Sequence, residues 1–437
     1  TLLASSAASD VYKRQLMDKE LKTSASISTF TRWMVVAIIS CGAYVVYLTY
    51  LARYSFYDQV IDGLKISNSQ LGVLYGLYGT TATIAYFPGG VLADKVRVKY
   101  LATLGFAMSS ILTFWYSTAP SYGQLKMIFL LFGLCTTFIF WGIRYKAIRL
   151  VSTEENYSTN IGISYGVVGV VGLVVSFISI GIFGKFADPA KGFKTVIMFY
   201  AIINAVFAVL SFIFIPKFAD EFENTEKKKL DFSELGQALK HPGVWLTTLC
   251  MFFVYTIYTS LAYTVSFLTA IGATAAIASV VGTIRTYGTS LFSSPIVGKI
   301  AQKKKPSIMI IVCGVITAVS LAVLAVAPKK AEFIIPAVVL IIILSFFLNG
   351  AYGVTSSMFT ETKVPAAIFG SASGILSVIG FVPDMFVSPV AGKWLDTYDT
   401  AGAYTRIFGV LAVSALLAVL CAYLVKVYAK KLEANEK

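Results

Sequence analysis

The 437-residue sequence has little of what enzymes and metal proteins use to build their sites. It contains one histidine, His241, in a polar stretch where we expect a solvated loop residue, and five cysteines whose spacing matches no disulfide or metal-binding pattern. It has no glycine-rich phosphate loop followed by Lys-Ser or Lys-Thr, and no Ser, His and Asp set. Only 13% of its residues are charged, well below the roughly 25% of an average soluble domain. We therefore expect neither an enzyme nor a bound metal or cofactor.

Long apolar stretches dominate what is present. Apolar residues make up 57% of the chain, and stretches of about 20 such residues, long enough to cross a bilayer core, recur twelve times. They lie at residues 33–57, 70–92, 100–118, 125–143, 160–183, 195–215, 245–268, 276–298, 307–327, 333–357, 367–391 and 406–428. Several contain Gly, Ser, Thr and Tyr, so these helices must pack together and line a wet space. The sequence predicts an all-α membrane protein with twelve transmembrane helices.

The chain also repeats itself at one fixed offset, a shift of 208 residues from Gly90 to Gly298. The shift pairs Gly90-Val91-Leu92-Ala93-Asp94-Lys95 with Gly298-Lys299-Ile300-Ala301-Gln302-Lys303, and Gly184-Lys185-Phe186-Ala187-Asp188 with Gly392-Lys393-Trp394-Leu395-Asp396. A duplication of this size in an apolar sequence is typical of transporters built from two similar halves. We expect two pseudo-symmetric six-helix bundles, at residues 33–216 and 244–428.

The remaining segments are assigned from composition and charge. We expect a cytoplasmic N-terminus at 17–32, a cytoplasmic linker at 217–243 with a short surface helix at 230–239, and a cytoplasmic tail at 429–437. Residues 1–16 resemble translated sequencing-adapter read-through, and we expect them to be non-native, with the natural start at Met17.

The chain has a net charge of +14, and its basic residues are concentrated in particular loops. Basic residues cluster in alternate loops that lie on one side of the predicted bundles, at Lys13, Arg14, Lys19, Lys22, Arg32, Lys95, Arg97, Lys99, Lys227, Lys228, Lys229, Lys240, Lys303, Lys304, Lys305, Lys426, Lys430 and Lys431. Because cytoplasmic loops of membrane proteins carry excess Lys and Arg, we expect both termini in the cytoplasm and the chain in a bacterial inner membrane. The pattern indicates a lipid bilayer, not a nucleic acid, as the partner of these charges. We further expect a monomer.

Twelve spans in two halves, with Gly90-x-Leu92-Ala93-Asp94-Lys95 after the second span and a degenerate copy after the eighth, resemble the major facilitator superfamily. The resemblance covers residues 30 to 430, although Arg97 replaces a glycine of the family motif. It implies secondary transport by alternating access and a gating role for Gly90, Asp94, Lys95 and Gly298. Gly90 would let helices approach closely, and Asp94 would cap a helix or pair with a base across the interface between the halves. The alternative is a solvated turn.

Two anion-carrying branches of this superfamily share partial features with the chain. The segment Tyr50-Leu51-Ala52-Arg53-Tyr54-Ser55-Phe56 is similar to the first span of organophosphate:phosphate antiporters, whose arginine binds phosphate. Tyr258 stands where their second arginine would fall, and Tyr86 lies near their lysine. Nitrate/nitrite carriers are similar in an arginine on span 8, here Arg285, and in glycine-rich spans 5 and 11. In this chain those glycines, which would allow close and sliding helix contacts, are Gly162, Gly166, Gly169, Gly172, Gly370, Gly374 and Gly380.

Ionisable residues inside the spans are candidate functional residues, because a charge at membrane depth is costly unless it faces a cavity or a partner. Arg285 lies 13 residues before Gly298, about 20 Å along a helix and past the middle of a roughly 30 Å core. Its planar fork suits carboxylate or phosphate-like oxygens, and the alternative is an ion pair with Asp384. Asp384 follows Pro383 in mid-span and is the one clear deep carboxylate, which makes it the candidate for proton coupling.

Arg53 shares a helical face with Tyr50 and Tyr57, which suits an oxygen-rich anion. The alternative is an arginine that extends to the outer headgroups. The repeat also pairs phenols on spans 1 and 7, which line the central cavity in the superfamily. We expect these to bind substrate: Tyr47, Tyr50, Tyr255 and Tyr258.

These residues predict a secondary active transporter of a small organic or inorganic anion, held by Arg285 and Arg53. The anion would be exchanged for another anion or carried with a coupling ion. The alternative is a proton-coupled symporter of a neutral sugar, or an exporter of drug-like compounds, that depends on Asp384.

Overall fold

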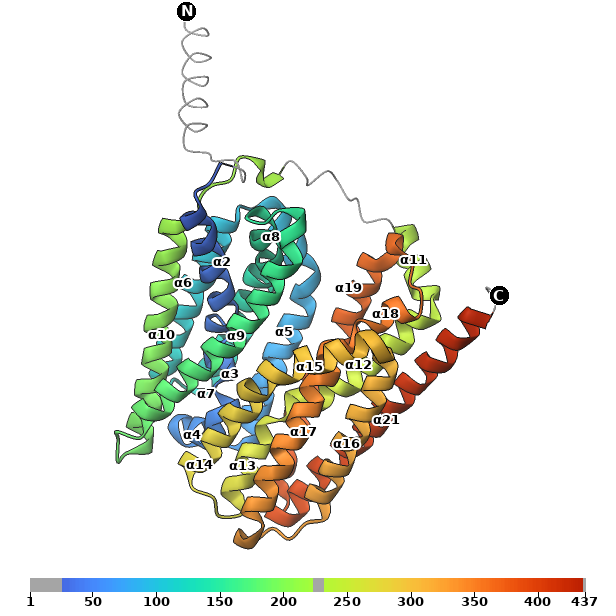
Figure 1. The fold of residues 1–437 in the computed structure, drawn as a ribbon. Coiled ribbons are helices and arrows are strands. Elements are labelled where there is room, and N and C mark those ends of the chain that lie inside the picture. The colour runs from blue at the N-terminus through green and yellow to red at the C-terminus, as the bar shows by residue number, and fades with distance from the viewer. Residues whose placement is uncertain (1–25, 223–231, 435–437) are drawn as a thin grey trace, which may run out of the picture.

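The computed structural model describes residues 26–222 and 232–434, and Figure 1 shows their helices. The segment predicted to be non-native, 1–16, and the middle of the linker lie outside the described residues. The first bundle comprises α2 (Thr29–Val45), α3 (Leu48–Leu51) and α4 (Arg53–Leu64) as span 1, α5 (Asn68–Lys95) as span 2, α6 (Val98–Ser117) as span 3, α7 (Tyr122–Gly133), η1 (Leu134–Trp141) and α8 (Gly142–Leu150) as span 4, α9 (Glu154–Phe183) as span 5 and α10 (Pro189–Phe214) as span 6.

The second bundle repeats this order after a linker that contains η2 (Asp220–Phe222) and α11 (Phe232–Lys240). Its elements are α12 (Pro242–Ser260) and α13 (Ala262–Ala270) as span 7, α14 (Ala275–Thr283), η3 (Ile284–Gly288) and α15 (Thr289–Lys304) as span 8, α16 (Pro306–Val326) as span 9, η4 (Ala331–Phe333), α17 (Ile334–Thr355) and α18 (Met358–Glu361) as span 10, η5 (Ala366–Ile368), α19 (Phe369–Gly380) and α20 (Pro383–Thr397) as span 11, and α21 (Thr400–Ala434) as span 12. The predicted architecture of twelve spans in two bundles is confirmed.

Nine of the described helical segments are long and apolar enough to cross a membrane. The other three spans, at residues 29–64, 68–95 and 275–304, are broken or more polar. Two of these three spans carry Arg53 and Arg285, so spans that do not meet this criterion supply the basic residues of the candidate site.

Three spans break at membrane depth. Span 1 is interrupted between Val45 and Leu48 and again at Ala52, span 7 at Leu261, and span 11 just before Pro383. Proline lacks the N–H that would continue the hydrogen bonding of α19. Irregular backbone at this depth is tolerated where it is buried in protein or lines a cavity, so these breaks mark the interior between the bundles. Spans 4 and 8 each contain a π-helical segment, η1 and η3, a feature frequent at functional sites.

The two bundles stand side by side in Figure 1, the first from blue to green and the second from yellow to red. The start of α2, the linker helix α11 and the end of α21 lie at one end, which we call the terminal face. The opposite end, the far face, is where α4 meets α13 and α14, and where α5 packs along α20.

Glycines on one side of α5 let α20 approach closely. A Cβ at Gly76 would lie 2.8 Å from the carbonyl oxygen of Met385, and one at Gly79 would lie 2.5 Å from that of Asp384. Small residues at such spacing are typical of tight helix pairs in membranes. This contact between the bundles holds Asp384 against span 2.

The gating motif at the terminal face does not make the contacts predicted for it. A Cβ added at Gly90 or Gly298 would meet no atom within 4 Å, whereas one at Gly89 would lie 2.8 Å from the Thr137 carbonyl oxygen. The close approach predicted at Gly90 is not formed in this conformation, in which the neighbouring Gly89 faces span 4. Asp94 and Lys95 are exposed and bond to no other described residue, since the bundles meet at the far face.

The charged contact at this corner comes from the linker instead. The buried Glu221 accepts a hydrogen bond from Val98 N (2.6 Å), at the start of α6, and pairs with Lys146 Nζ (3.1 Å). Helix N-termini favour a carboxylate because their first N–H groups have no partner within the helix. Glu221 thus attaches the start of the linker to the first bundle.

The end of the linker docks on the second bundle. Helix α11 confirms the predicted short helix, and it packs against α19 and α12. His241 is not a solvated loop residue, because it begins α12 as its N-cap and its Nδ1 accepts from Gly243 N (3.2 Å). Partial burial lowers the pKa of this imidazole.

The glycines of spans 5 and 11 meet neighbours at only some positions. A Cβ at Gly172 would collide with the Tyr287 ring, and one at Gly169 would lie 2.6 Å from Leu291. By contrast, a Cβ would meet nothing within 4 Å at four positions of this set, which are Gly162, Gly166, Gly370 and Gly374. The predicted close contact is therefore confined to the part of span 5 that faces span 8, and to Gly380 near Met251.

Candidate functional site

Arg53 is the centre of a buried polar cluster between the bundles. Its side chain is only 2% exposed. Nη2 donates to Tyr50 OH (2.9 Å) and Thr259 Oγ1 (3.2 Å), and Nη1 donates to Ser388 Oγ (3.0 Å). The guanidinium carbon also lies 3.8 Å from the centroid of the Tyr75 ring, a cation–π arrangement. The alternative in which Arg53 extends to the outer headgroups is wrong, because the breaks in span 1 turn it inward.

Asp384 lies opposite Arg53 in the same cluster, in the first turn of α20. Its Oδ2 accepts from Tyr255 OH (2.6 Å), and its Oδ1 accepts from Thr259 Oγ1 (2.5 Å) and Tyr50 OH (3.4 Å). Arg53 and Asp384 therefore share the hydroxyl groups of Tyr50 and Thr259 as hydrogen-bond partners, and these hydroxyl groups link the two opposite charges. A helix N-terminus also favours a carboxylate.

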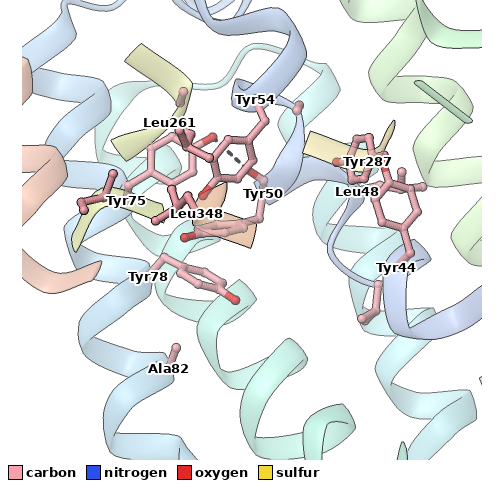
Figure 2. Packing of buried hydrophobic residues seen from close by; sticks show 14 of the residues in the cluster. Tyr44, Leu48, Tyr50, Tyr54, Tyr75, Tyr78, Ala82, Leu261, Tyr287 and Leu348 are labelled. Carbon is pink, nitrogen blue, oxygen red and sulfur yellow. Dashed lines mark hydrogen bonds between the residues drawn. The ribbon is translucent and has the colours of Figure 1, made fainter. Parts of the chain in front are cut away.

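The four phenols predicted from the repeat occupy different environments. Tyr50 stacks on Tyr78 with ring centroids 4.0 Å apart, and Figure 2 shows both beside Tyr75. Tyr47 donates to the carbonyl oxygen of Thr136 in η1 (3.2 Å), so its hydroxyl is directed to span 4. The repeat pairs these residues by position only, and their contacts are not symmetric.

The second pair of phenols lies on span 7. Tyr255 reaches Asp384, as described above. Tyr258 stacks on Tyr352 with centroids 4.7 Å apart and ring planes 17° apart. Tyr352 belongs to span 10.

Arg285 lies within the π-helical η3 and has no exposed surface. Its Nη2 donates to the Tyr54 carbonyl oxygen (3.1 Å), across the two bundles. Its Nε and Nη1 make no hydrogen bond with any described residue. No described carboxylate lies within ion-pair distance of it, so the alternative pairing with Asp384 does not form. A buried, uncompensated charge costs several kcal/mol, and the two donors without a described partner could bind an anion.

Two cations therefore lie near Tyr54, and Asp384 belongs to the same cluster through the hydroxyl groups that it shares with Arg53. The guanidinium carbons of Arg53 and Arg285 lie 5.1 Å and 5.5 Å from the centroid of the Tyr54 ring. With Asp384 ionised, these three groups carry a net charge of +1. The arrangement favours a negatively charged ligand.

Sequence reasoning missed two hydroxyl residues of this cluster. Thr259 lies four residues after Tyr255, and Ser388 lies four residues after Asp384. Residues at this spacing share a helical face, so a search for polar residues one turn from each candidate would have found both.

The sequence of the chain matches a known protein family. The model of the Major Facilitator Superfamily matches residues 23–388. The inner membrane protein YqcE of Escherichia coli (strain K12) is 28% identical over 389 residues, which cover 87% of this chain and 91% of that protein. The inner membrane protein YihN of the same strain is 25% identical over 88% of this chain and 93% of that protein.

Solved structures share the fold at low sequence identity. A bacterial homologue of the human lysosomal transporter Spinster, in an inward-facing and unoccupied conformation, has a TM-score of 0.73 at 14% identity, covering 92% of this chain and 98% of that one. The nucleoside transporter NupG has a TM-score of 0.70 at 14% identity, covering 90% of this chain and 98% of that one. This chain belongs to the Major Facilitator Superfamily, whose members are multi-pass membrane transporters that work by alternating access.

Proposed function

We propose that this protein carries a small organic or inorganic anion across the bacterial inner membrane, with Arg285 and Arg53 holding the negative group. The observation that carries the proposal is the guanidinium of Arg285, which is fully buried, has two donor nitrogens without a described partner and faces no carboxylate. An anion would satisfy both donors and neutralise the charge. Arginine suits this role because its donors form a planar fork.

Alternating access would bring the anion to Arg285. The guanidinium has no exposed surface in this conformation, and its bond to Tyr54 joins the two bundles. Rocking of the bundles about their interface would break that bond and turn the free donors toward the central space. Residues 33–216 and 244–428 are proposed to be the two moving bodies.

We infer the orientation in the membrane from the distribution of charge. Basic loops gather at the terminal face, and such loops are retained in the cytoplasm. With the terminal face inside, the contacts at the far face seal the outer side, and this conformation would be the inward-facing one. Gly90, Asp94, Lys95 and Gly298 would then meet the opposite bundle only in the outward-facing conformation.

Asp384 is proposed to couple the anion to a proton. Protonation would remove its negative charge and raise the charge of the cluster from +1 to +2, which strengthens the attraction for an anion. Deprotonation toward the cytoplasm would weaken that attraction and help release. The alternative, symport of a neutral solute through Asp384, has the same carboxylate in its support but leaves Arg285 without a function.

The test is uptake into proteoliposomes after a panel of probes has identified a ligand by thermal shift. The panel holds nitrate, sulfate, phosphate, glycerol phosphate and glucuronate, with glucose as the uncharged probe. Arg285→Ala should abolish uptake of the anion that stabilises the wild type. Arg406→Ala, which alters an exposed arginine on α21, is the matched control and should transport normally. Retained uptake by Arg285→Ala, or stabilisation by glucose alone, would overturn the proposal.

A further inference from the structure

An unbroken run of aromatic rings crosses the space between the bundles. Neighbouring centroids lie 4.6–6.0 Å apart. In order along the run the rings are Trp141, Tyr86, Phe381, Tyr255, Tyr258 and Tyr352. They come from spans 4, 2, 11, 7 and 10, and the contact of Tyr86 with Phe381 joins the two bundles. The run therefore lies inside the molecule, between the bundles, and not on the surface that faces lipid.

These rings are not packed as the aromatic core is packed. Core rings such as Phe267 and Phe408 have no exposed surface. Five of the six rings in the run keep intermediate exposure, and Phe381 alone is buried. Aromatic surface inside a transporter that stays partly uncovered is available to a ligand.

The geometry at the end of the run suits a flat ligand. The ring planes of Tyr255 and Tyr258 differ by 17°, as do those of Tyr258 and Tyr352. Because neighbouring rings are nearly parallel, a further ring can stack on these tyrosines in an offset arrangement. A ring that binds here would be enclosed by residues of both halves of the duplicated fold.

The aromatic run adjoins the charged cluster at Tyr255 and Tyr258. The Tyr255 hydroxyl donates to Asp384 (2.6 Å), and Tyr258 precedes Thr259, which bonds both Arg53 and Asp384. Cationic groups and a stacking surface thus adjoin within one site.

We infer that the substrate is an organic anion whose negative group is attached to a ring with an apolar face, and that Tyr258 and Tyr352 stack on that ring. This inference rests on the proposed function of the same site and narrows it. An inorganic anion would reach the guanidinium groups and leave the aromatic faces uncovered. A ring-bearing carboxylate, sulfonate or phosphate ester would contact both the guanidinium groups and the aromatic faces. The ring is either a pyranose, which offers its C–H face, or an aromatic ring.

The experiment measures binding to the purified full-length protein with four probes of graded structure. Glucuronate carries a carboxylate on a pyranose, benzoate carries one on an aromatic ring, gluconate is an open-chain hydroxy acid, and nitrate has no ring. We expect glucuronate or benzoate to bind at least tenfold more tightly than gluconate and nitrate, and the better of the two identifies the kind of ring.

Variants then test the stacking residue. Tyr352→Ala should weaken binding of the preferred ring-bearing probe about tenfold and leave nitrate binding unchanged, whereas Tyr352→Phe should bind like the wild type. Tyr423→Ala, at an exposed position of α21, is the control. Rescue by phenylalanine separates loss of stacking from loss of folding.

The outcomes distinguish this inference from the proposed function. If nitrate or gluconate binds as tightly as the ring-bearing probes, or if Tyr352→Ala binds normally, the inference is overturned while anion transport through Arg285 stands. If anion binding does not depend on Arg285, both fail.

Discussion

Replacing Asp396 by asparagine would remove the charge that joins the two bundles at the far face. Asp396, at the end of α20, accepts hydrogen bonds from Asn68 N (3.1 Å), Asn68 Nδ2 (3.0 Å) and Ser69 N (2.7 Å) at the start of α5. These backbone N–H groups have no partner within their own helix. Its counterpart in the repeat, Asp188, instead caps α10 within its own bundle, so Asp396 alone of this pair bridges the bundles.

The size of the effect follows from the geometry and exposure of this contact. A hydrogen bond to a charged group contributes roughly 1.5–3 kcal/mol when it is shielded from water. Asp396 is exposed, and asparagine retains one acceptor oxygen, so we expect a loss of about 1 kcal/mol. The contact must break when the bundles part at the far face. The population that is closed there should therefore fall about fivefold relative to the open one, since each 1.4 kcal/mol is a tenfold change.

The assay is a distance measurement between spin labels at Lys65→Cys and Lys393→Cys, two exposed positions on opposite bundles at the far face. Asp396→Asn should increase the fraction with the longer distance. Asp399→Asn is the matched control, because Asp399 caps α21 through Gly402 N (3.1 Å) within one bundle. An unchanged distance distribution in Asp396→Asn, or an equal shift in both variants, would refute the reasoning.

Three further predictions concern the interior. Arg285→Met should fold with an equal or higher Tm, because it removes a buried charge that lacks a described counter-ion; a fall of several degrees in a thermal melt would show that the charge is compensated. Arg53→Ala should lower the free energy of unfolding by about 3 kcal/mol, because it leaves Asp384 buried without a cation. Adding Asp384→Ala should recover part of that loss in a double-mutant cycle. Strictly additive effects of the two substitutions would contradict the coupling between Arg53 and Asp384. Gly172→Val should reduce the yield of folded protein, because its side chain would collide with a ring of span 8, whereas Gly166→Val should behave as the wild type; chromatographic monodispersity checks both, and equal behaviour would count against the packing described.

The sequence alone predicted the number of spans and their duplication, because both are regular along the chain. A bilayer core requires about 20 apolar residues in each helix, and a repeat keeps its register over its whole length. It also indicated Arg285, Arg53 and Asp384, since charge at membrane depth is conspicuous in an apolar span. Which residues these charges contact could not be read in the same way.

Those contacts depend on tertiary structure, as Asp384 illustrates. Its partner Tyr50 and the nearby Arg53 lie more than 300 residues away in the chain, and hydrogen bonds from both residues to α20 join span 1 to span 11. Breaks in spans 1 and 11 then rotate the side chains away from the positions of a continuous helix. The sequence pattern suggested only a pairing of Asp384 with Arg285, whereas the structure places Asp384 beside Arg53, with which it shares two hydroxyl partners.

The conformation is likewise a tertiary property. Gly90 and Asp94 are proposed to contact the opposite bundle in the other conformation, and they are exposed here, where the bundles meet at the far face. A transporter's sequence must stabilise two arrangements of the same helices, and it contains the contacts of both. Only the relative placement of the two bundles determines which set of contacts is formed.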